Sequence, residues 1–359
     1  MKNVAVVMAG GKGERFWPKS RNNLPKQFLS LTQEDETMIQ LTVRRINALV
    51  AYEDIYIVTN QDYVGLVSEQ LPQIPNENIL SEPKPRNTAP CIGFAAAVIS
   101  QKYDDAVMLV LPSDHLIKFE EIYIDTMAQA IQVAQEDGNL VTIGITPTYP
   151  ETGYGYIHFG RDEGTPKYRG VYIVKRFVEK PDMDTAKEYL SSGQYLWNSG
   201  MFVWKLSTIL QQFKLLLPDI YRGITEIGQA YGTPEYETVL ERCFSAFKSE
   251  SIDYGIMERA TAIYTLPGNF GWDDVGSWLA LERIQKTNES GNTVNGDVIT
   301  INTKDSIIVG DKKLIAVVGL ENVVIVDTED ATLICGKNAT QDVKKVIENL
   351  KICNRSELV

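Results

Sequence analysis

The stretch VAVVMAGGKGERFWPKSRNNLPKQF, from Val4 to Phe28, contains the signals that decide the fold. Its first part, Val4–Met8, is a short apolar run rich in valine that ends at glycines, which predicts a buried strand. A glycine cluster follows, and the remainder holds five cations and a single carboxylate. Glycine-rich loops after a strand commonly bind phosphates, so the stretch predicts a phosphate-binding loop at the end of the first strand.

Two common phosphate-binding motifs can be compared with this loop. The P-loop requires Gly, four residues and then Gly-Lys-Ser/Thr, but here Lys12 precedes Gly13 and no hydroxyl residue follows in register. Gly11 and Gly13 match the dinucleotide fingerprint Gly-x-Gly-x-x-Gly, whereas Phe16 occupies the third glycine position. The mismatch argues against a dehydrogenase, and a simple tight turn between strand and loop remains an alternative.

The segment after the glycines favours phosphate binding over that alternative. Pro18 and Pro25 fix φ and disfavour a helix before each of them, so this segment should be extended and stiff. It carries Arg15 and Lys26, which can hold phosphate oxygens while glycine backbone N–H groups hold the remaining charge. Such an arrangement suits a polyphosphate.

Strand and helix patterns alternate through the first part of the chain, which predicts a sheet with helices on both faces. We expect an α/β fold with a Rossmann-like, doubly wound sheet that is mixed but mainly parallel. Ligands of such sheets bind beyond the carboxyl ends of the strands. The predicted strands are Val4–Met8, Asp54–Thr59, Ala106–Leu111, Leu140–Ile145 and Val171–Val178, and the predicted helices are Thr37–Val50, Asn60–Gln70, Thr88–Tyr103, Glu121–Glu136, Asp184–Ser191 and Leu206–Leu217.

The chain changes character after Lys286. The segment TNESGNTVNGD is rich in Asn, Gly, Thr and Ser and predicts a boundary, so we expect a catalytic domain of residues 1–288. Residues 289–359 contain short β-rich runs that resemble loose coils of a left-handed β-helix, followed by a helix with Thr340 as its expected N-cap. These residues should form a small β-rich domain.

The composition is that of an ordinary globular protein, with 44% hydrophobic and 23% charged residues among 359. A net charge of −12 argues against broad nucleic-acid binding. Four scattered cysteines and only two histidines argue against a disulfide framework and a zinc site. No signal-peptide pattern and no apolar run near the ~20 residues of a membrane helix occur, so we expect a cytoplasmic protein without a membrane partner.

The residues AGGKGERFWPKSRNNLPKQF resemble the signature of the sugar-1-phosphate nucleotidylyltransferases. Their Trp-Pro-x-Ser-Arg and Pro-Lys-Gln-Phe elements are most similar to the mannose-1-phosphate guanylyltransferases, also called GDP-mannose pyrophosphorylases, and the similarity extends over essentially the full chain. Enzymes of this family join a nucleoside triphosphate to a sugar 1-phosphate and release pyrophosphate. The resemblance implies catalytic roles for Arg15 and Lys26, and nucleotide contacts from Ala9, Gly10, Gly11 and Gly13.

A second motif, SEPKPRNTAP, spans Ser81–Pro90. Taken alone, it is a proline-rich loop in which Thr88 caps the next helix. The resemblance instead implies that Glu82, Arg86 and Asn87 lie beside the guanine base of the nucleotide. An amide or a carboxylate at this place can recognise the N1–H and N2 edge of guanine.

Two acidic motifs provide candidate metal ligands. Asp114 in LPSDH follows a predicted central strand, although alone it could be a turn residue or a cap. Asp273 and Asp274 are adjacent, so on an extended segment they point opposite ways, and one could bind metal while the other fixes the loop. They could also cap a helix that begins near Ser277. The resemblance implies Mg²⁺ on Asp114 and Asp274, with Asp114 also contacting the nucleotide, and leaves the choice between Asp273 and Asp274 open.

The resemblance implies a sugar-phosphate pocket built from several motifs. Glu179 would bind sugar hydroxyls and Lys180 the sugar phosphate, with Lys180 also catalytic, whereas an adjacent Glu–Lys pair is otherwise a solvated edge. Glycines near Tyr154 allow close approach of the backbone to a sugar, or simply form a turn. Alone, Asn198 would be a turn residue and Asp253 a helix cap. The implied set is Gly153, Tyr154, Glu179, Lys180, Asn198 and Asp253.

These assignments predict the reaction of GTP with α-D-mannose 1-phosphate to give GDP-mannose and pyrophosphate, with Mg²⁺ as cofactor. The sugar phosphate oxygen is already anionic at neutral pH, so positioning and charge neutralisation suffice without a general base. The sequence also allows another sugar 1-phosphate or nucleotide. A non-catalytic paralogue that senses GDP-mannose is a further alternative, although the charges that it would lose are present. We also expect a homodimer, and no mannose-6-phosphate isomerase activity.

Overall fold

The computed structural model describes residues 1–32, 34–164 and 167–359, with the backbone alone for residues 161–164. These residues form two compact units. The sheet unit comprises Met1–Gly10, Val43–Ser113 and Ile117–Trp272. The loop unit comprises Gly11–Thr42, Asp114–Leu116 and Asp273–Val359.

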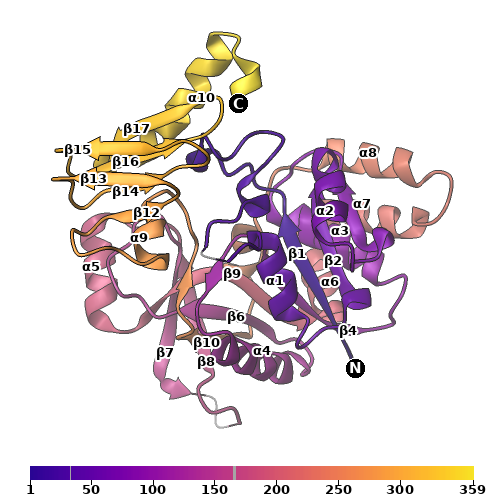
Figure 1. Cartoon of the computed structure of the whole chain (residues 1–359). Coiled ribbons are helices and arrows are strands. Elements are labelled where there is room, and N and C mark those ends of the chain that lie inside the picture. Colours follow the sequence, from indigo (N-terminus) through magenta and orange to yellow (C-terminus); the bar gives the residue numbers. More distant parts are fainter. Residues whose placement is uncertain (33, 165–166) are drawn as a thin grey trace. The chain divides into compact units, whose positions relative to one another are not determined.

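A nine-stranded mixed sheet, counted over the described residues, forms the centre of the sheet unit (Figure 1). Its strand order is β3-β2-β1-β4-β9-β6-β10-β8-β7. The first four strands run parallel, β9 is antiparallel to both of its neighbours, and β10 is parallel to β6. The strands are β1 (Lys2–Ala9), β2 (Ile55–Asn60), β3 (Ile79–Glu82), β4 (Ala106–Pro112), β6 (Leu140–Ile145), β7 (Tyr156–Gly164), β8 (Tyr172–Val178), β9 (Tyr195–Lys205) and β10 (Ile263–Gly268).

Both faces of the sheet are covered, as its central strand shows. Successive strand residues point to opposite faces, and Val4–Val7 in β1 are all fully buried. Val4 and Val6 belong to a core cluster with Phe94 of α3 and Phe244 of α8. The helices are α1 (Met38–Ile46), α2 (Val64–Gln70), α3 (Thr88–Ile99), α4 (Glu120–Ala134), α5 (Met183–Ser192), α6 (Leu206–Leu216), α7 (Pro218–Ala230) and α8 (Tyr236–Ala246).

The register of the parallel strands aligns their carboxyl ends. Ala9 pairs with Thr59, and Asn60 pairs with Glu82, so the ends of β1, β2 and β3 lie at one edge of the sheet. The neighbouring strand β4 pairs its last residue, Pro112, with Met8. The glycine-rich loop, the motif that begins at Ser81 and the LPSDH motif all leave the sheet from this edge.

The loop unit contains coils of a β-helix. Parallel strands β12, β14 and β16 form one face, β13 and β15 form another, and β17 turns back antiparallel to β16. Side chains from β14 and β16 share a core cluster with Phe16 of the glycine-rich loop and Ile347 of α10. The remaining elements are β5 (Leu116–Ile117), β11 (Trp272–Asp273), α9 (Ala280–Ile284), β12 (Thr293–Asn295), β13 (Val298–Ile301), β14 (Ile307–Val309), β15 (Ile315–Val318), β16 (Val323–Asp327), β17 (Thr332–Gly336) and α10 (Val343–Ile352).

The predicted α/β sheet and β-helix-like region are confirmed, but three caps differ from the prediction. Asn87, not Thr88, is the N-cap of α3, because its side chain accepts from the Thr88 backbone N–H. Thr340 lies inside a 3₁₀ turn, Lys337–Asp342, so α10 begins after Asp342 instead. Asp253 caps no helix: it begins a π-helical turn, Asp253–Met257, and its side chain accepts from Asn198.

The predicted boundary between residues 288 and 289 remains a prediction. Residues 273–359 share a compact unit with 11–42 and 114–116, because the core of the β-helix also contains Phe16 and Trp17. Among the described residues, no helix has the length and apolar character needed to cross a bilayer.

Candidate active site

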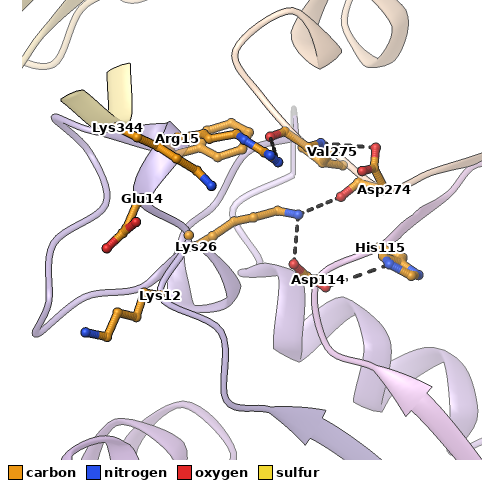
Figure 2. A pocket seen from close by; sticks show the side chains of 12 residues that line it. Lys12, Glu14, Arg15, Lys26, Asp114, His115, Asp274, Val275 and Lys344 are labelled. Carbon is orange, nitrogen blue, oxygen red and sulfur yellow. Dashed lines mark hydrogen bonds and ion pairs between the residues drawn. The ribbon is translucent and has the colours of Figure 1, made fainter. Parts of the chain in front are cut away.

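A pocket of about 400 Å³ lies within the loop unit and is called the loop pocket here. Figure 2 shows that Lys26, Asp114 and Asp274, which are far apart in the sequence, lie next to one another there. It gathers five residues that the sequence assigns to nucleotide, metal or catalysis, namely Gly13, Arg15, Lys26, Asp114 and Asp274. Its other lining residues are Lys12, Glu14, Phe16, His115, Val275, Gly276 and Lys344.

Gly13 allows the loop to fold closely over Lys26. Its φ of 60° lies in the left-handed region, and a Cβ there would lie 2.3 Å from the Cβ of Lys26. Ser20 secures the same turn, since its Oγ donates to the Gly13 carbonyl at 2.8 Å. Beside this turn, the side chain of Gln27 donates to the Gly11 carbonyl at 3.1 Å. The glycines thus shape the loop, and any larger residue at position 13 would displace Lys26.

Lys26 connects the two acidic motifs of the loop pocket. Its buried ammonium lies 2.9 Å from Asp114 Oδ2 and donates to the Asp274 carbonyl at 2.6 Å. Burial works to raise the pKa of Asp114, but the charge and the hydrogen bond of Lys26 oppose it, and this pKa lies below its usual range. Asp114 is therefore an anion at neutral pH.

Arg15 is held in the pocket without a carboxylate partner among the described residues. Its Nη1 lies 3.5 Å from the Gly276 carbonyl, which is a long hydrogen bond. Its buried Nε has no hydrogen-bond partner in the described part of the chain. Buried donors are normally satisfied, so this guanidinium is suited to an incoming anion.

The adjacent acids Asp273 and Asp274 have different surroundings. Asp273 is buried and receives a forked contact from Arg283, with Nη2 to Oδ1 at 2.9 Å. Its Oδ1 also accepts from the Val275 N–H at 2.8 Å, which fixes the loop. Asp274 lines the loop pocket. Neither side chain caps α9, which begins only at Ala280, so the helix-cap alternative is wrong.

Asp114 and Asp274 together fit a divalent cation. Both are carboxylates on one pocket, and hard cations such as Mg²⁺ are often held by one or two carboxylates plus substrate phosphates. In the described part of the chain, no cluster of three or more His, Cys, Asp and Glu could hold a metal without substrate. His115 supplies no charge, because burial lowers its pKa despite the opposing effect of Asp114.

The residues assigned to base recognition lie in the sheet unit. Glu82 ends β3 beside Gly10, whose Cβ, if present, would lie 3.6 Å from Glu82 Oε2. Burial raises the pKa of Glu82 to about 8, and its Oε1 has no partner among the described residues. A buried carboxyl beside Gly10, with one oxygen that lacks a partner among the described residues, is suited to a hydrogen-bonding ligand.

The other two residues of that motif have structural partners. The Arg86 guanidinium donates to the carbonyls of Phe244 and Ser245 at 2.8 and 3.0 Å, at the end of α8. Asn87 adopts a left-handed φ of 70° and caps α3. These contacts position the loop. They also use guanidinium N–H groups of Arg86 and the side-chain oxygen of Asn87, which direct contacts with a base would need.

Four residues assigned to the sugar phosphate come together in the sheet unit. Lys180 Nζ lies 2.7 Å from Glu179 Oε1, and Asn198 donates to Asp253 Oδ1 at 2.7 Å. Gly155 joins the two pairs: its carbonyl accepts from the Asn198 N–H at 2.8 Å, and a Cβ on it would lie 2.6 Å from Glu179 Oε2. Burial raises the pKa of Asp253, with the Glu179 charge adding to the effect.

Aromatic rings border this polar cluster. The Tyr154 ring packs edge-on against Trp197 at 5.3 Å and against Trp272 at 5.4 Å between centroids. Gly153, one residue earlier, donates its N–H to Glu151 Oε1 at 2.7 Å, so its present role is in the turn. Ala9 ends β1 and its carbonyl accepts from Thr59 at 2.9 Å.

Sequence reasoning missed several residues of the loop pocket. His115 follows Asp114 directly and could have been found from that motif. Lys12 and Glu14 lie within the glycine-rich stretch and were similarly accessible. Gly276 lies two residues after Asp274 and could have been found in the same way. Lys344 could not, since it lies on the C-terminal helix α10, far in sequence from every motif of the pocket.

Known proteins resemble this chain over nearly its whole length. A family model described as nucleotidyl transferase matches residues 4–291, and one described as a mannose-phosphate isomerase/GMP-like β-helix domain matches residues 296–350. A mannose-1-phosphate guanylyltransferase of Escherichia coli (strain K12) is 42% identical over 361 residues, which cover 99% of this chain and 75% of that protein. A protein of that description from Salmonella muenchen shares the same identity and coverage.

A solved structure extends the similarity to the fold. It is described as a mannose-1-phosphate geranyltransferase from Thermus thermophilus, and it is 32% identical with a TM-score of 0.88. The match covers 98% of this chain and 100% of that one. With its family-model matches and its identity to these relatives, the chain belongs to the nucleotidyl transferase family, within the group of mannose-1-phosphate guanylyltransferases.

Proposed function

We propose that the protein transfers GMP from GTP to α-D-mannose 1-phosphate and releases pyrophosphate. The observation that carries the proposal is the loop pocket, where Arg15 and Lys26 lie with Asp114 and Asp274 beside the turn at Gly13. The names of the relatives supply the sugar and the base. In the reaction a mannose phosphate oxygen bonds to the α-phosphorus, and the bond from that phosphorus to the bridging oxygen breaks, so pyrophosphate leaves with the electron pair.

The chain's own residues act mainly by position and charge. Arg15 and the glycine backbone hold the departing pyrophosphate, and Lys26 neutralises the region of the α-phosphate. Lys180, more exposed and next to Glu179, aims the attacking phosphate. No general base is required, which agrees with a neutral His115 beside Asp114.

Asp114 and Asp274 would hold Mg²⁺, which supplies positive charge to the phosphates when bound. Asp273 is committed to Arg283, so Asp274 is the better candidate of the adjacent pair. Glu82 is the residue of its motif best placed to recognise the base, because it is buried and its Oε1 lacks a partner in the described part of the chain. We further propose a cytoplasmic location and a homodimer.

The proposal is tested by measuring pyrophosphate release with each common nucleoside triphosphate against a panel of hexose 1-phosphates, with and without Mg²⁺. We expect the highest kcat/KM for GTP with mannose 1-phosphate, and no turnover without a divalent cation. A clear preference for another pair would replace the substrates. Tight binding of GDP-mannose without any turnover would instead support a sensing role.

A further inference from the structure

Lys344 lines the loop pocket, although it comes from the C-terminal helix α10. Figure 2 shows its side chain extending from that helix toward Arg15 and Lys26, whereas Lys12 extends away from them. Lys344, Arg15 and Lys26 therefore bring three positive charges to one pocket from two segments of the loop unit, Gly11–Thr42 and Asp273–Val359.

The position of Lys344 follows from the packing of α10. Val343 and Ile347 are buried in the core cluster that contains Phe16 and Trp17 of the glycine-rich loop. The Trp17 indole N–H donates to the Leu358 carbonyl at 2.7 Å, which ties the segment after α10 to the same loop. Lys351 adds a 3.9 Å ion pair with Glu14. The helix is thus attached at several points beside Arg15.

The charges of the pocket are unbalanced on the Arg15 side. Lys26 pairs with Asp114, but Arg15 and Lys344 form no ion pair among the described residues. The next residue, Lys345, differs, because it forms a 2.8 Å ion pair with Asp342, the residue just before α10. Cations that share a pocket and form no ion pair repel each other, and a bound anion reduces that cost.

We propose that Lys344 binds the terminal phosphates of the nucleoside triphosphate and holds the leaving pyrophosphate together with Arg15. The terminal phosphates are the suitable ligand because Lys26, Asp114 and Asp274 form the other side of the pocket, where the α-phosphate and the metal are assigned. The inference rests on the proposed function. It makes the C-terminal helix a direct part of the substrate site.

The test is direct binding of inorganic pyrophosphate with Mg²⁺ to the full chain, measured by titration calorimetry. Lys344→Ala should weaken this binding about tenfold, the loss expected for one hydrogen bond to a charged group. Lys344→Arg keeps the charge and should restore most of the affinity. Lys345→Ala removes the same charge from the same helix away from the pocket and should bind like the wild type.

Kinetics provide the second measurement. For Lys344→Ala, the KM for GTP in the forward reaction and for pyrophosphate in the reverse reaction should rise about tenfold, while the KM for the sugar phosphate stays unchanged. Equal rises in every KM, or a lower melting temperature in Lys344→Ala than in Lys345→Ala, would indicate a structural role and overturn the proposal. Unchanged pyrophosphate affinity in Lys344→Ala would also overturn it.

The two proposals fail in different ways. If the wild type makes GDP-mannose but Lys344→Ala binds pyrophosphate normally, only the role of Lys344 is wrong. If Lys344→Ala weakens pyrophosphate while the wild type prefers another nucleotide or sugar, the role of Lys344 stands and the substrates change.

Discussion

At the scale of single residues, Asp273 and Asp274 show how neighbours in sequence acquire different roles. Alternation along an extended segment allows one to fix the loop and the other to face a ligand. Only the structure shows that the Arg283 guanidinium contacts Asp273 with two nitrogens, whereas Asp274 lines the loop pocket. The contact with Arg283 explains why the two carboxylates are not interchangeable.

This difference leads to a prediction from a matched pair of variants. Asp274→Asn should abolish Mg²⁺-dependent turnover but leave the melting temperature almost unchanged. Asp273→Asn should instead lower the free energy of unfolding by about 1–3 kcal/mol, because it weakens a charge-assisted contact to Arg283. Turnover assays and thermal unfolding of both variants check this. If Asp273→Asn abolished turnover and Asp274→Asn lowered stability, Asp273 would be the metal ligand and Asp274 the structural residue.

Glu82 gives a prediction for the pH dependence of stability. Its pKa is about 8 in the folded protein against an ordinary value of 4.5, because it is buried. Between these values the unfolded chain loses the proton while the folded protein keeps it, so stability falls as pH rises toward about 8 and the loss is then complete. Below the ordinary value both states are protonated and the full stability is present.

Glu82→Gln cannot ionise at this position. The difference between its melting temperature and that of the wild type should therefore become more positive from pH 5 to pH 9. Thermal unfolding across this range measures the difference. Glu77→Gln, at an exposed position nearby, is the control and should follow the wild type at every pH. Parallel curves for Glu82→Gln and the wild type would show that Glu82 is ionised in the folded protein at neutral pH.

At the scale of secondary-structure elements, α10 carries more of the site than its sequence indicates. The sequence pattern predicted a helix in this region but not the residues against which it packs. Amphipathic spacing indicates which face of a helix is buried, but not which part of the chain covers that face. In the structure that face packs on Phe16 of the glycine-rich loop. The expected cap at Thr340 failed because residues 337–342 form a 3₁₀ turn first.

The packing of α10 predicts the effect of a core variant. Ile347→Ala should lower the free energy of unfolding by about 2–5 kcal/mol and should also raise the KM for GTP, because the glycine-rich loop loses part of its support. Glu348→Ala, on the exposed side of the same helix, is the control. Thermal unfolding and GTP kinetics test this. A loss of stability with an unchanged KM for GTP would show that the packing of α10 does not support the substrate site.

At the scale of the whole molecule, the charge distribution contrasts with the net charge. The chain carries −12, which argues against polyanion binding in general, yet four cations line the loop pocket. The negative net charge therefore does not argue against an anionic substrate, because cations are concentrated locally in this pocket. The predicted homodimer remains a prediction, which sedimentation of the full chain would check against the monomer mass of 40.2 kDa.

The sequence by itself determined the alternation of strands and helices, the glycine-rich loop and the family, because these depend on local patterns and short motifs. It also named Arg15, Lys26, Asp114 and Asp274 through those motifs. Only the tertiary structure decided that these four lie on one pocket, that Arg283 holds Asp273, and that Lys344 joins them. Contacts between residues far apart in the chain depend on packing in three dimensions, which no local pattern records.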